Sequence, residues 1–443
     1  MKLNFTLNGL KKTFSVEPGE NAQEFLQRIG CRSVRDSDNH QGFCGSDTVI
    51  LNGKTVNAGL LIAAQLEGKD VRTIESVNEG NGLSAVQSAM VDCGLVQSGY
   101  NSPAAALMLT NLFERSANPT KDEVTDALSG LFSRSAGYQP FYKAVELAKK
   151  RMADPSLKPE GYKEYRPDLR EVGKLRRKID GHQLVAGHKA FVEDMVDPDA
   201  CILKMLQSPY AHAYIKTINI SEAEKVPGVV TIITYQNCPD VYYTNAGQGA
   251  PEPSPHDRRL FNKKLCYVGD RVAAVVAETE EAADEALAKI RVEYEVLKPV
   301  FTWDEAAASD APIIHKAFVT YGVGAPEDLD EYNKNALPDD GKIHYPFPIH
   351  ADPHHNLAAS VKGGIGDVEK GFKEADVIID RTFSTTQIQC TPTEPHVVYT
   401  KMQGDRQVIH ASTQVPFHLR RIVAKILGIP ETKVHVIKER VGG

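Results

Sequence analysis

Apolar and polar residues alternate in short runs over the first 75 residues, and one segment near residues 21–30 has helical spacing instead. A period of two residues is typical of a β-strand with one buried face. Asn8-Gly9 separates the first two runs, and this dipeptide favours the tight turn of a β-hairpin. We therefore expect a small mixed β-sheet with one helix at the start of the chain.

Residues 76–152 change to helical spacing. Ser102 followed by Pro103 is typical of an N-cap and a first helical position. Thr120 and Glu123 have the spacing of a capping box, in which each side chain bonds to the other residue's backbone N–H. These signals predict a helical bundle.

Residues 153–176 are polar and charged and contain three prolines, so we expect a linker there. Strand and helix patterns then alternate up to about residue 300. Thr279 is the expected N-cap of one helix, and Ser221 with Glu224 has the spacing of another capping box. This alternation predicts an α/β domain.

Residues 301–357 are rich in Pro and His and show no clear periodicity, so they are expected to be an irregular connection. A third α/β segment begins near residue 358 and continues to the end of the chain. The whole pattern predicts a multidomain α+β protein.

Composition narrows the class of protein. A chain of 443 residues is long enough for about three or four domains. Its net charge of -7 provides no basic face for nucleic acid. No apolar run approaches the roughly 18 residues that a membrane span needs. The seven cysteines are scattered rather than closely paired, which favours reduced thiols and a cytoplasmic location.

Four polar residues stand in a spacing that cysteines usually occupy. Ser98, Asn101, Ser133 and Ser135 are separated by two, 31 and one residues, within VQSGYNSP and LFSRSAGY. These segments resemble QCGFCTPG and LCRCTGY of the xanthine dehydrogenase and aldehyde oxidase family, whose four cysteines hold a [2Fe–2S] cluster. The resemblance implies a cluster domain that has lost its ligands.

An earlier segment, NHQGFCGSDTVILNGKTVNAGL, resembles the second cluster loop of the same family. Its ligand positions fall on Asn39, Cys44, Asp47 and Gly59, so one thiol of four is left. Because such clusters need Cys thiolates or, in a minority, His, we expect no [2Fe–2S] cluster in this chain. Cys44, Asp47 and His40 could alternatively bind zinc, or the loop could simply hold no metal.

The resemblance continues along the chain in the family's domain order. Residues 179–195 and 203–230 are similar to its α/β-hammerhead domain, and residues 409–443 to its first molybdopterin-binding segment. The degenerate cluster regions resemble the family's selenium-dependent branch. The domains implied are a degenerate ferredoxin-like β-grasp domain (1–75), a degenerate four-helix [2Fe–2S]-type domain (76–152), a linker (153–176), an α/β-hammerhead (177–300), a connection (301–357) and the first part of a molybdopterin-binding domain (358–443).

Two departures from the family pattern bear on function. The flavin domain is absent between the helical and hammerhead regions, so FAD is not expected in this chain and electrons would leave through a separate FAD or iron–sulfur subunit. The sequence also ends at VGG, where the family continues into GGGFGGK and further residues that include the general base. The resemblance therefore implies no catalytic residue here and a complementary molybdopterin-domain chain or missing C-terminal part.

Gln414, in the STQ motif, is the main candidate for binding the cofactor, because the family has an amide beside molybdenum at this position. A glutamine satisfied by backbone at a strand end is the alternative. Gly442 and Gly443 resemble the start of a loop that approaches the cofactor closely, as glycine permits, or they are an ordinary terminus. Glu394 is expected to be structural, and Cys390 a buried free thiol rather than a metal ligand.

Two functions remain open. The first is part of a molybdenum hydroxylase that hydroxylates a purine or related N-heterocycle with oxygen from water. Its cofactor would be molybdopterin, with terminal selenium or sulfur on the metal. The second is a catalytically silent scaffold that lacks its own active site. The missing cysteines argue against a ferredoxin-like electron carrier.

Overall fold

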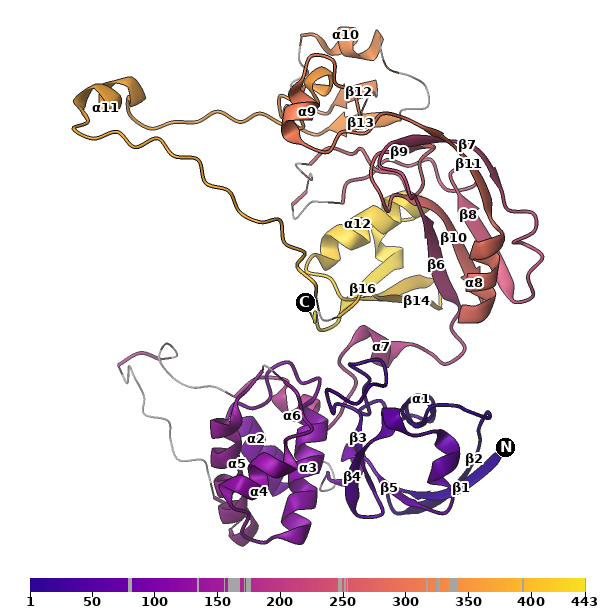
Figure 1. The fold of residues 1–443 in the computed structure, drawn as a ribbon, viewed down its shortest axis with the longest axis vertical. Coiled ribbons are helices and arrows are strands. Elements are labelled where there is room, and N and C mark those ends of the chain that lie inside the picture. The colour runs from indigo at the N-terminus through magenta and orange to yellow at the C-terminus, as the bar shows by residue number, and fades with distance from the viewer. Residues whose placement is uncertain are drawn as a thin grey trace. The chain divides into compact units, whose positions relative to one another are not determined.

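The chain forms two compact units, Met1–Met195 and Val196–Val441, which are described separately (Figure 1). The computed structural model describes residues 1–78, 82–133, 135–154, 156–157, 168–170, 172, 177–245, 249–250, 252, 254–315, 318–323, 325, 327–334, 336, 341–392 and 394–442. Most of the expected linker, 153–176, lies outside these residues. No helix in the described part is long and apolar enough to cross a membrane.

The first unit begins with a five-stranded sheet in the order β2-β1-β5-β3-β4. Its elements are β1 (Lys2–Leu7), β2 (Leu10–Ser15), α1 (Ala22–Arg28), β3 (Thr48–Leu51), β4 (Lys54–Asn57) and β5 (Asp70–Arg72), with short 3-10 turns at Ala58–Leu60, Ala63–Leu66 and Ile74–Ser76. The predicted hairpin is confirmed: Leu7 pairs with Leu10, and Asn8 and Gly9 both have positive φ. Phe5 and Phe14 pack on Phe25 of α1 and close the core over the sheet.

The rest of this unit is helical. It contains α2 (Ala85–Asp92), α3 (Ser102–Arg115), α4 (Lys121–Ala127), α5 (Tyr138–Ala153), α6 (Gly181–Val185) and α7 (Val192–Met195). The capping box of Thr120 and Glu123 is confirmed at α4. The predicted N-cap at Ser102 is wrong by one residue. Asn101 is the N-cap, and because Ser102 is itself helical its hydroxyl cannot cap from outside the helix.

A buried ion pair ties the sheet region to the helical region. Arg35 follows α1, Asp194 lies in α7, and their side chains are 3.0 Å apart and almost fully buried. The Arg35 guanidinium also donates to the carbonyl of Tyr100 at 3.2 Å and lies over the rings of Tyr100 and Phe191. One buried cation therefore contacts two other segments of the first unit, the one that leads into α3 and the one that forms α7.

The second unit contains two antiparallel three-stranded sheets, ordered β6-β10-β8 and β11-β7-β9. Their elements are β6 (Ile202–Gln207), β7 (Ala213–Asn219), β8 (Val229–Thr234), β9 (Lys264–Leu265), β10 (Arg271–Ala277), α8 (Glu280–Lys289) and β11 (Arg291–Val296). Thr279 caps α8 as predicted. The capping box expected at Ser221 is wrong: residues 221–225 form turns, and the Ser221 backbone and hydroxyl bond to the Asn219 side chain instead.

The segment expected to be irregular, 301–357, has more regular structure than its composition indicates. It contains α9 (Trp303–Ala307), β12 (Phe318–Tyr321), α10 (Leu329–Lys334), β13 (Lys342–Tyr345) and a 3-10 turn at Pro353–His355. The strands β12 and β13 pair in parallel around a small core of Val319, Ile343 and Tyr345. These contacts join residues about two dozen positions apart and have no local periodic signal.

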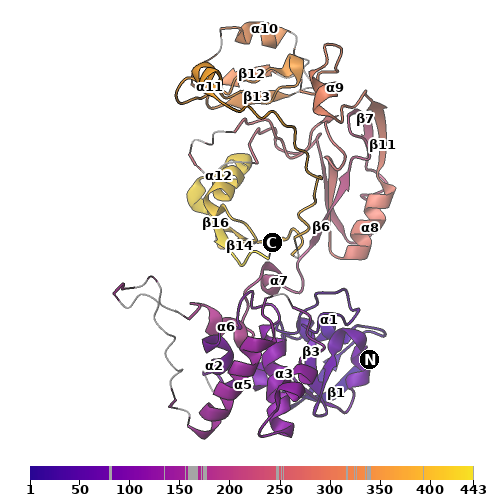
Figure 2. The ribbon, with the colours of Figure 1, turned by 60° about the vertical axis from the view of Figure 1, so that its left-hand side comes forward.

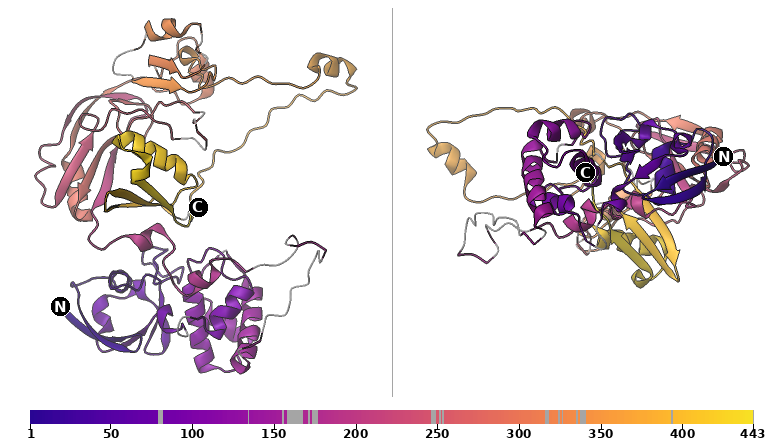
Figure 3. Two further views of the ribbon diagram at one scale, coloured as in Figure 1. Left: turned by 180° about the vertical axis from the view of Figure 1, so that it is seen from behind. Right: turned by 90° about the horizontal axis from the view of Figure 1, so that it is seen from below.

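The last segment contains α11 (Val368–Glu374), β14 (Val398–Gln403), β15 (Arg406–Ala411), α12 (Pro416–Leu427), a 3-10 turn at Glu431–Lys433, and β16 (Val434–Lys438). The strands are ordered β14-β15-β16, with β15 and β16 parallel and α12 packed on β16 (Figure 2). Residues 361–391 are exposed throughout and run as an extended chain that carries α11 (Figure 3).

Candidate functional site

The first candidate site is the loop that follows α1, where the Asp38 carboxylate accepts hydrogen bonds from several backbone N–H groups of the same loop. Asp38 accepts hydrogen bonds from the N–H groups of Gln41 at 3.2 Å, Cys44 at 2.8 Å, and Phe43. Partial burial by itself would raise the pKa of Asp38, but the bonds from Cys44, Phe43, Gln41 and Gly42 outweigh it and hold the pKa below its usual value. A side chain of the loop itself, Asp38, therefore supplies the negative charge to which the loop's amides donate.

The neighbouring ligand positions are also filled by protein atoms. The Gly59 N–H donates to Asp47 Oδ2 at 2.6 Å, so two of the four positions bond to each other. A Cβ atom on Gly59 would lie 3.0 Å from Asp47 Oδ2 and 3.3 Å from the Cα of His40. Burial raises the pKa of Asp47 more than the bond from Gly59 lowers it. A side chain at residue 59 would find its space already occupied.

The two other positions of this loop point elsewhere. The Cys44 thiol faces the carbonyl of Ser37 at 3.8 Å, and Asn39 is exposed with a positive φ of 55°. No group of three or more His, Cys, Asp or Glu side chains suited to a metal ion is found in the described part of the chain. The zinc alternative for Cys44, Asp47 and His40 thus receives no support from the geometry.

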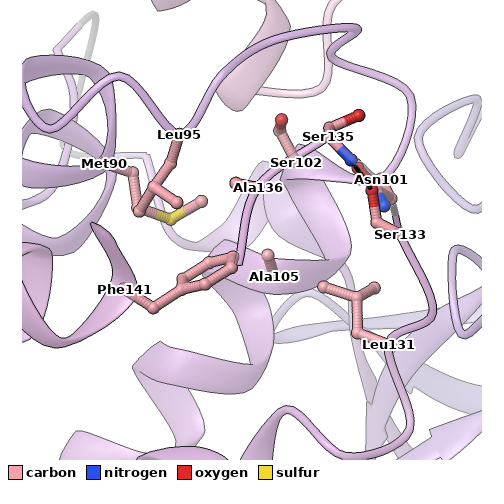
Figure 4. Close-up of a pocket in the computed structure, with 10 residues that line it drawn as sticks. All are labelled: Met90, Leu95, Asn101, Ser102, Ala105, Leu131, Ser133, Ser135, Ala136 and Phe141. Atoms are coloured by element: carbon pink, nitrogen blue, oxygen red, sulfur yellow. Dashed lines mark hydrogen bonds between the residues drawn. The ribbon is translucent and has the colours of Figure 1, made fainter. Parts of the chain in front are cut away.

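The second framework is partly assembled around a small pocket. Asn101, Ser133 and Ser135 lie together at its rim, with Met90, Leu95, Ser102, Ala105, Leu131, Ala136 and Phe141 lining the rest (Figure 4). Its volume of about 10 Å³ is close to the minimum that holds one water molecule. Ser98 accepts a bond from the N–H of Tyr100 at 3.3 Å, and Ser133 accepts one from the N–H of Ser135 at 3.2 Å.

The two frameworks touch each other through the backbone. The Phe132 N–H donates to the carbonyl of Cys44 at 3.1 Å. Gly45, at a φ of +68°, would place a Cβ only 2.2 Å from the carbonyl oxygen of Gly130, so no larger residue fits there. The segments that would surround two clusters are therefore packed directly on each other.

In the second unit, Gln414 lies exposed between the end of β15 and the start of α12. Nearby, the Ser412 hydroxyl donates to Glu394 at 2.7 Å. The Val415 N–H donates to the Thr413 hydroxyl at 3.1 Å and orders the entry to the helix. Gly442 is described, whereas Gly443 lies outside the described residues. The structure thus leaves the Gln414 amide accessible at a strand–helix junction.

Cys390 is free, as expected, but it is exposed rather than buried, because it belongs to the extended segment 361–391. The prediction that the Cys390 thiol is buried was wrong. A free thiol behaves as a buried apolar group only where other elements of the fold cover it.

A buried ionic cluster anchors α12, and the sequence contained no signal for it. Glu252 accepts bonds from His418 Nδ1 at 3.1 Å and from the Arg421 guanidinium at 2.8 Å, while His418 Nε2 faces the carbonyl of Thr244 at 3.2 Å. Burial by itself would raise the pKa of Glu252, but the bonds from His418 and Arg421 lower it overall. These partners are more than 160 residues apart, so only the tertiary structure brings them together.

Three family models match the chain. They are "[2Fe-2S] binding domain" over residues 73–146, "Aldehyde oxidase and xanthine dehydrogenase, a/b hammerhead domain" over 186–298, and "Molybdopterin cofactor-binding domain" over 349–443. The chain is 56% identical over 443 residues to "Probable hypoxanthine oxidase XdhD" of Escherichia coli K12, covering 100% of this chain and 46% of that protein.

More distant relatives have the same arrangement. An aldehyde oxidoreductase of Megalodesulfovibrio gigas is 27% identical over 456 residues, covering 99% of this chain and 46% of the relative. The solved structure of the aldehyde oxidoreductase from Desulfovibrio gigas superposes with a TM-score of 0.69 at 25% identity, covering 100% of this chain and 46% of that one. This chain belongs to the xanthine dehydrogenase and aldehyde oxidase family, and it spans about half the length of these relatives.

The residues present do not fit the iron–sulfur cluster that the 73–146 model implies. Ser98, Asn101, Ser133 and Ser135 offer no thiolate or imidazole to iron, and the pocket at three of them holds about one water. In the region that the molybdopterin-binding model matches, the Gln414 amide is exposed and can both donate and accept hydrogen bonds, so it is available to a cofactor.

Proposed function

We propose that this chain is part of a molybdenum hydroxylase that hydroxylates a purine or a related N-heterocycle with oxygen from water. The observation that carries the proposal is the 56% identity, along the whole chain, to a protein named as a hypoxanthine oxidase. The molybdopterin-binding model over residues 349–443 supports the same cofactor for this chain. When bound, that cofactor, with terminal selenium or sulfur on its metal, would supply the two-electron redox chemistry.

In this proposal, the residues of this chain bind the cofactor and orient it. Gln414 and the backbone at Gly442 and Gly443 would hold the cofactor, and the Gln414 amide would orient it by hydrogen bonding. The Glu252–His418–Arg421 cluster fixes α12, and thereby the junction at Gln414, in place. No catalytic acid or base is assigned to this chain.

The active site is completed by a complementary molybdopterin-domain chain or by a C-terminal part of the same protein. We call either of these the complementary polypeptide, and it corresponds to the part of the E. coli relative that this chain does not match. It supplies the general base and the remaining cofactor contacts. Electrons pass to a separate FAD or iron–sulfur subunit, the substrate is a small molecule, and the assembly works in the cytoplasm.

The first unit serves as a packing shell without [2Fe–2S] clusters. Asp38, Asp47 and His40 fill the first cluster loop, and serine and asparagine stand in the second. Iron and acid-labile sulfide, measured on anaerobically purified chain, are expected to be far below one cluster per chain. Two clusters per chain would overturn this part of the proposal.

The function is tested by producing the chain with the complementary polypeptide of the E. coli relative in a molybdenum-supplemented host. Stoichiometric molybdenum and turnover of hypoxanthine with an artificial electron acceptor are expected for the pair. The chain alone should bind no molybdenum. An assembled pair that binds molybdenum but turns over no N-heterocycle would contradict the proposed substrate class, and a pair without molybdenum would favour a silent scaffold.

A further inference from the structure

The two segments that the proposed function assigns to the cofactor leave the same edge of one sheet. The strands β15 and β16 run parallel and pair as far as Ala411 with Lys438. Gln414 follows the end of β15, and Gly442 follows the end of β16. Because parallel neighbours end at a common edge, where ligands of α/β sheets bind, the contacts at these strand ends set the spacing of the two segments.

A hydrogen bond between two side chains joins these strand ends. His410 lies one residue before the end of β15, and Glu439 directly follows β16. His410 Nδ1 donates to Glu439 Oε1 at 2.8 Å, and only 13% and 12% of the two side chains are exposed. An ionised carboxylate only accepts hydrogen bonds, so the proton of this bond is on Nδ1. Shielding from water strengthens such a bond.

Two further contacts hold this pair in the sheet. The ring of Tyr399, in β14, stacks on His410 with the ring centroids 5.8 Å apart and the planes at 23°. The Glu439 N–H donates to the carbonyl of Ala411 at 3.2 Å. His410 is therefore held by β14 on one side and by the end of β16 on the other.

A short ordered stretch of backbone connects the pair to Gln414. The Ser412 hydroxyl donates to Glu394, and the Thr413 hydroxyl accepts from the N–H of Val415. Between these two residues and the helix, the Gln414 side chain makes no hydrogen bond within the described part of the chain. The fold thus orders the backbone on both sides of Gln414 and leaves its amide available.

We propose that His410 and Glu439 are positioning residues, which set the spacing between the Gln414 amide and the Gly442 backbone. This inference rests on the proposed function, because it takes both segments to hold the cofactor. Neither residue of the pair is assigned a contact with the cofactor. Groups that bind a cofactor need to be held within roughly 0.5 Å of the productive geometry, and a bond between the two strand ends limits their relative movement.

The first test uses the full chain by itself and needs no cofactor. Hydrogen exchange of the backbone amides is compared between the parent chain, His410→Ala, Glu439→Ala and Glu439→Gln, the last of which keeps an oxygen acceptor for His410. Both alanine variants should exchange about tenfold faster in residues 411–415 and 438–442, and less than about threefold faster elsewhere in the second unit. Glu439→Gln should exchange as the parent does. Unchanged exchange in both segments would overturn the positioning role.

The second test uses the chain assembled with the complementary polypeptide of the E. coli relative. After dialysis, His410→Ala and Glu439→Ala should each retain about tenfold less molybdenum than the parent pair, and Glu439→Gln should restore the parent content. The double alanine variant should lose no more than either single variant, because both residues act through one bond.

A control of similar stability separates positioning from general stabilisation of the fold. Thr279→Ala removes the N-cap of α8 in the same unit, which costs about 1 kcal/mol, and it should leave the molybdenum content unchanged. An exposed histidine of β16 gives a second control, and His435→Ala should also leave it unchanged. Equal losses of molybdenum in Thr279→Ala and Glu439→Ala would mean that the pair only stabilises the fold, and would overturn the positioning role.

Failure of the proposed function and failure of this inference give different results. A parent pair without molybdenum would contradict the proposed function, while faster exchange at both segments in the alanine variants would still support the role of His410 and Glu439. A parent pair with molybdenum that both alanine variants retain in full would overturn the positioning role and leave the proposed function standing.

Discussion

The carboxylate of Asp38 accepts a hydrogen bond from the backbone N–H of Cys44 at 2.8 Å. Asp38 directly precedes the first position of the cluster framework, and Cys44 is the one thiol left in it. The backbone N–H groups of the loop therefore donate to a carboxylate of the loop itself, and these bonds hold the turn without a bound anion. This relationship explains how the fold persists while the ligands for iron are gone.

Removal of the Asp38 carboxylate should loosen the loop. Asp38→Ala leaves the N–H groups of Gln41, Phe43 and Cys44 without their acceptor, and each unsatisfied group costs about 1–3 kcal/mol when it stays buried. We expect the first unit to lose about 1–3 kcal/mol in urea unfolding and amide exchange at residues 41–44 to accelerate. Asp126→Ala on the exposed face of α4 is the control, and an equal loss there would contradict the role of Asp38.

The Arg35–Asp194 pair should be needed as a pair. Replacing one partner leaves a buried charge uncompensated, which costs about 3–5 kcal/mol. Asp194→Leu and Arg35→Met should each destabilise the first unit. The double variant should recover only part of the loss, because no charge remains buried but the N–H groups of Ala190 and Phe191 still lack their Asp194 acceptor. The only tryptophan, Trp303, lies in the second unit, so circular dichroism rather than tryptophan fluorescence should follow this unfolding. Additive losses in the double variant would rule out coupling.

Acid should weaken the second unit through Glu252. Its folded-state pKa lies below the ordinary value of 4.5, because bonds from His418 and Arg421 outweigh the effect of burial. A lowered folded-state pKa stabilises the fold above the unfolded-state pKa, and that contribution is lost as pH falls through the folded-state pKa. Urea unfolding followed by Trp303 fluorescence should therefore show a falling stability below about pH 4.5. Glu252→Gln should flatten this slope, and an unchanged slope would show that other groups cause it.

Cysteines returned to the second framework should restore a cluster. The variant that combines Ser98→Cys, Asn101→Cys, Ser133→Cys and Ser135→Cys places four thiolates at the ligand positions of the helical region, whose fold is retained. Anaerobic reconstitution with iron and sulfide should give visible absorption and, after reduction, an electron paramagnetic resonance signal that the parent chain lacks. Three cysteines returned to the first loop at Asn39, Asp47 and Gly59 should work less well, because His40 remains 3.3 Å from the position of a Cβ at residue 59.

Gln414 should affect the cofactor and not the fold. In the assembled pair, Gln414→Ala is expected to lower molybdenum content or turnover by about 10- to 100-fold, the range for groups that orient a metal's ligands. Gln403→Ala, at the exposed end of β14, is the matched control. Thermal unfolding should be the same for both variants. A loss of stability in Gln414→Ala alone would support the alternative that the residue is structural.

Signals carried by neighbouring residues determined much of this protein from sequence alone. The Asn8-Gly9 hairpin and the caps at Thr120 and Thr279 form as predicted, because each depends on the conformations of a few consecutive residues. The family and the loss of the cluster thiols were also readable, since both depend on residue type at fixed spacing. Ser221 shows the limit of such signals, because its capping box competes with a bond to Asn219 and forms no helix.

Only the tertiary structure decided which atoms occupy the degenerate cluster sites and which surfaces are exposed. Asp47 meets Gly59, Arg35 meets Asp194, and Glu252 meets His418 across separations of 12, 159 and 166 residues. No local pattern encodes such contacts, because they form only when separate elements pack and exclude water. Residues 376–389 show the converse: their sequence favours a strand, but a strand needs a neighbouring edge, and the described part of this chain provides none for it.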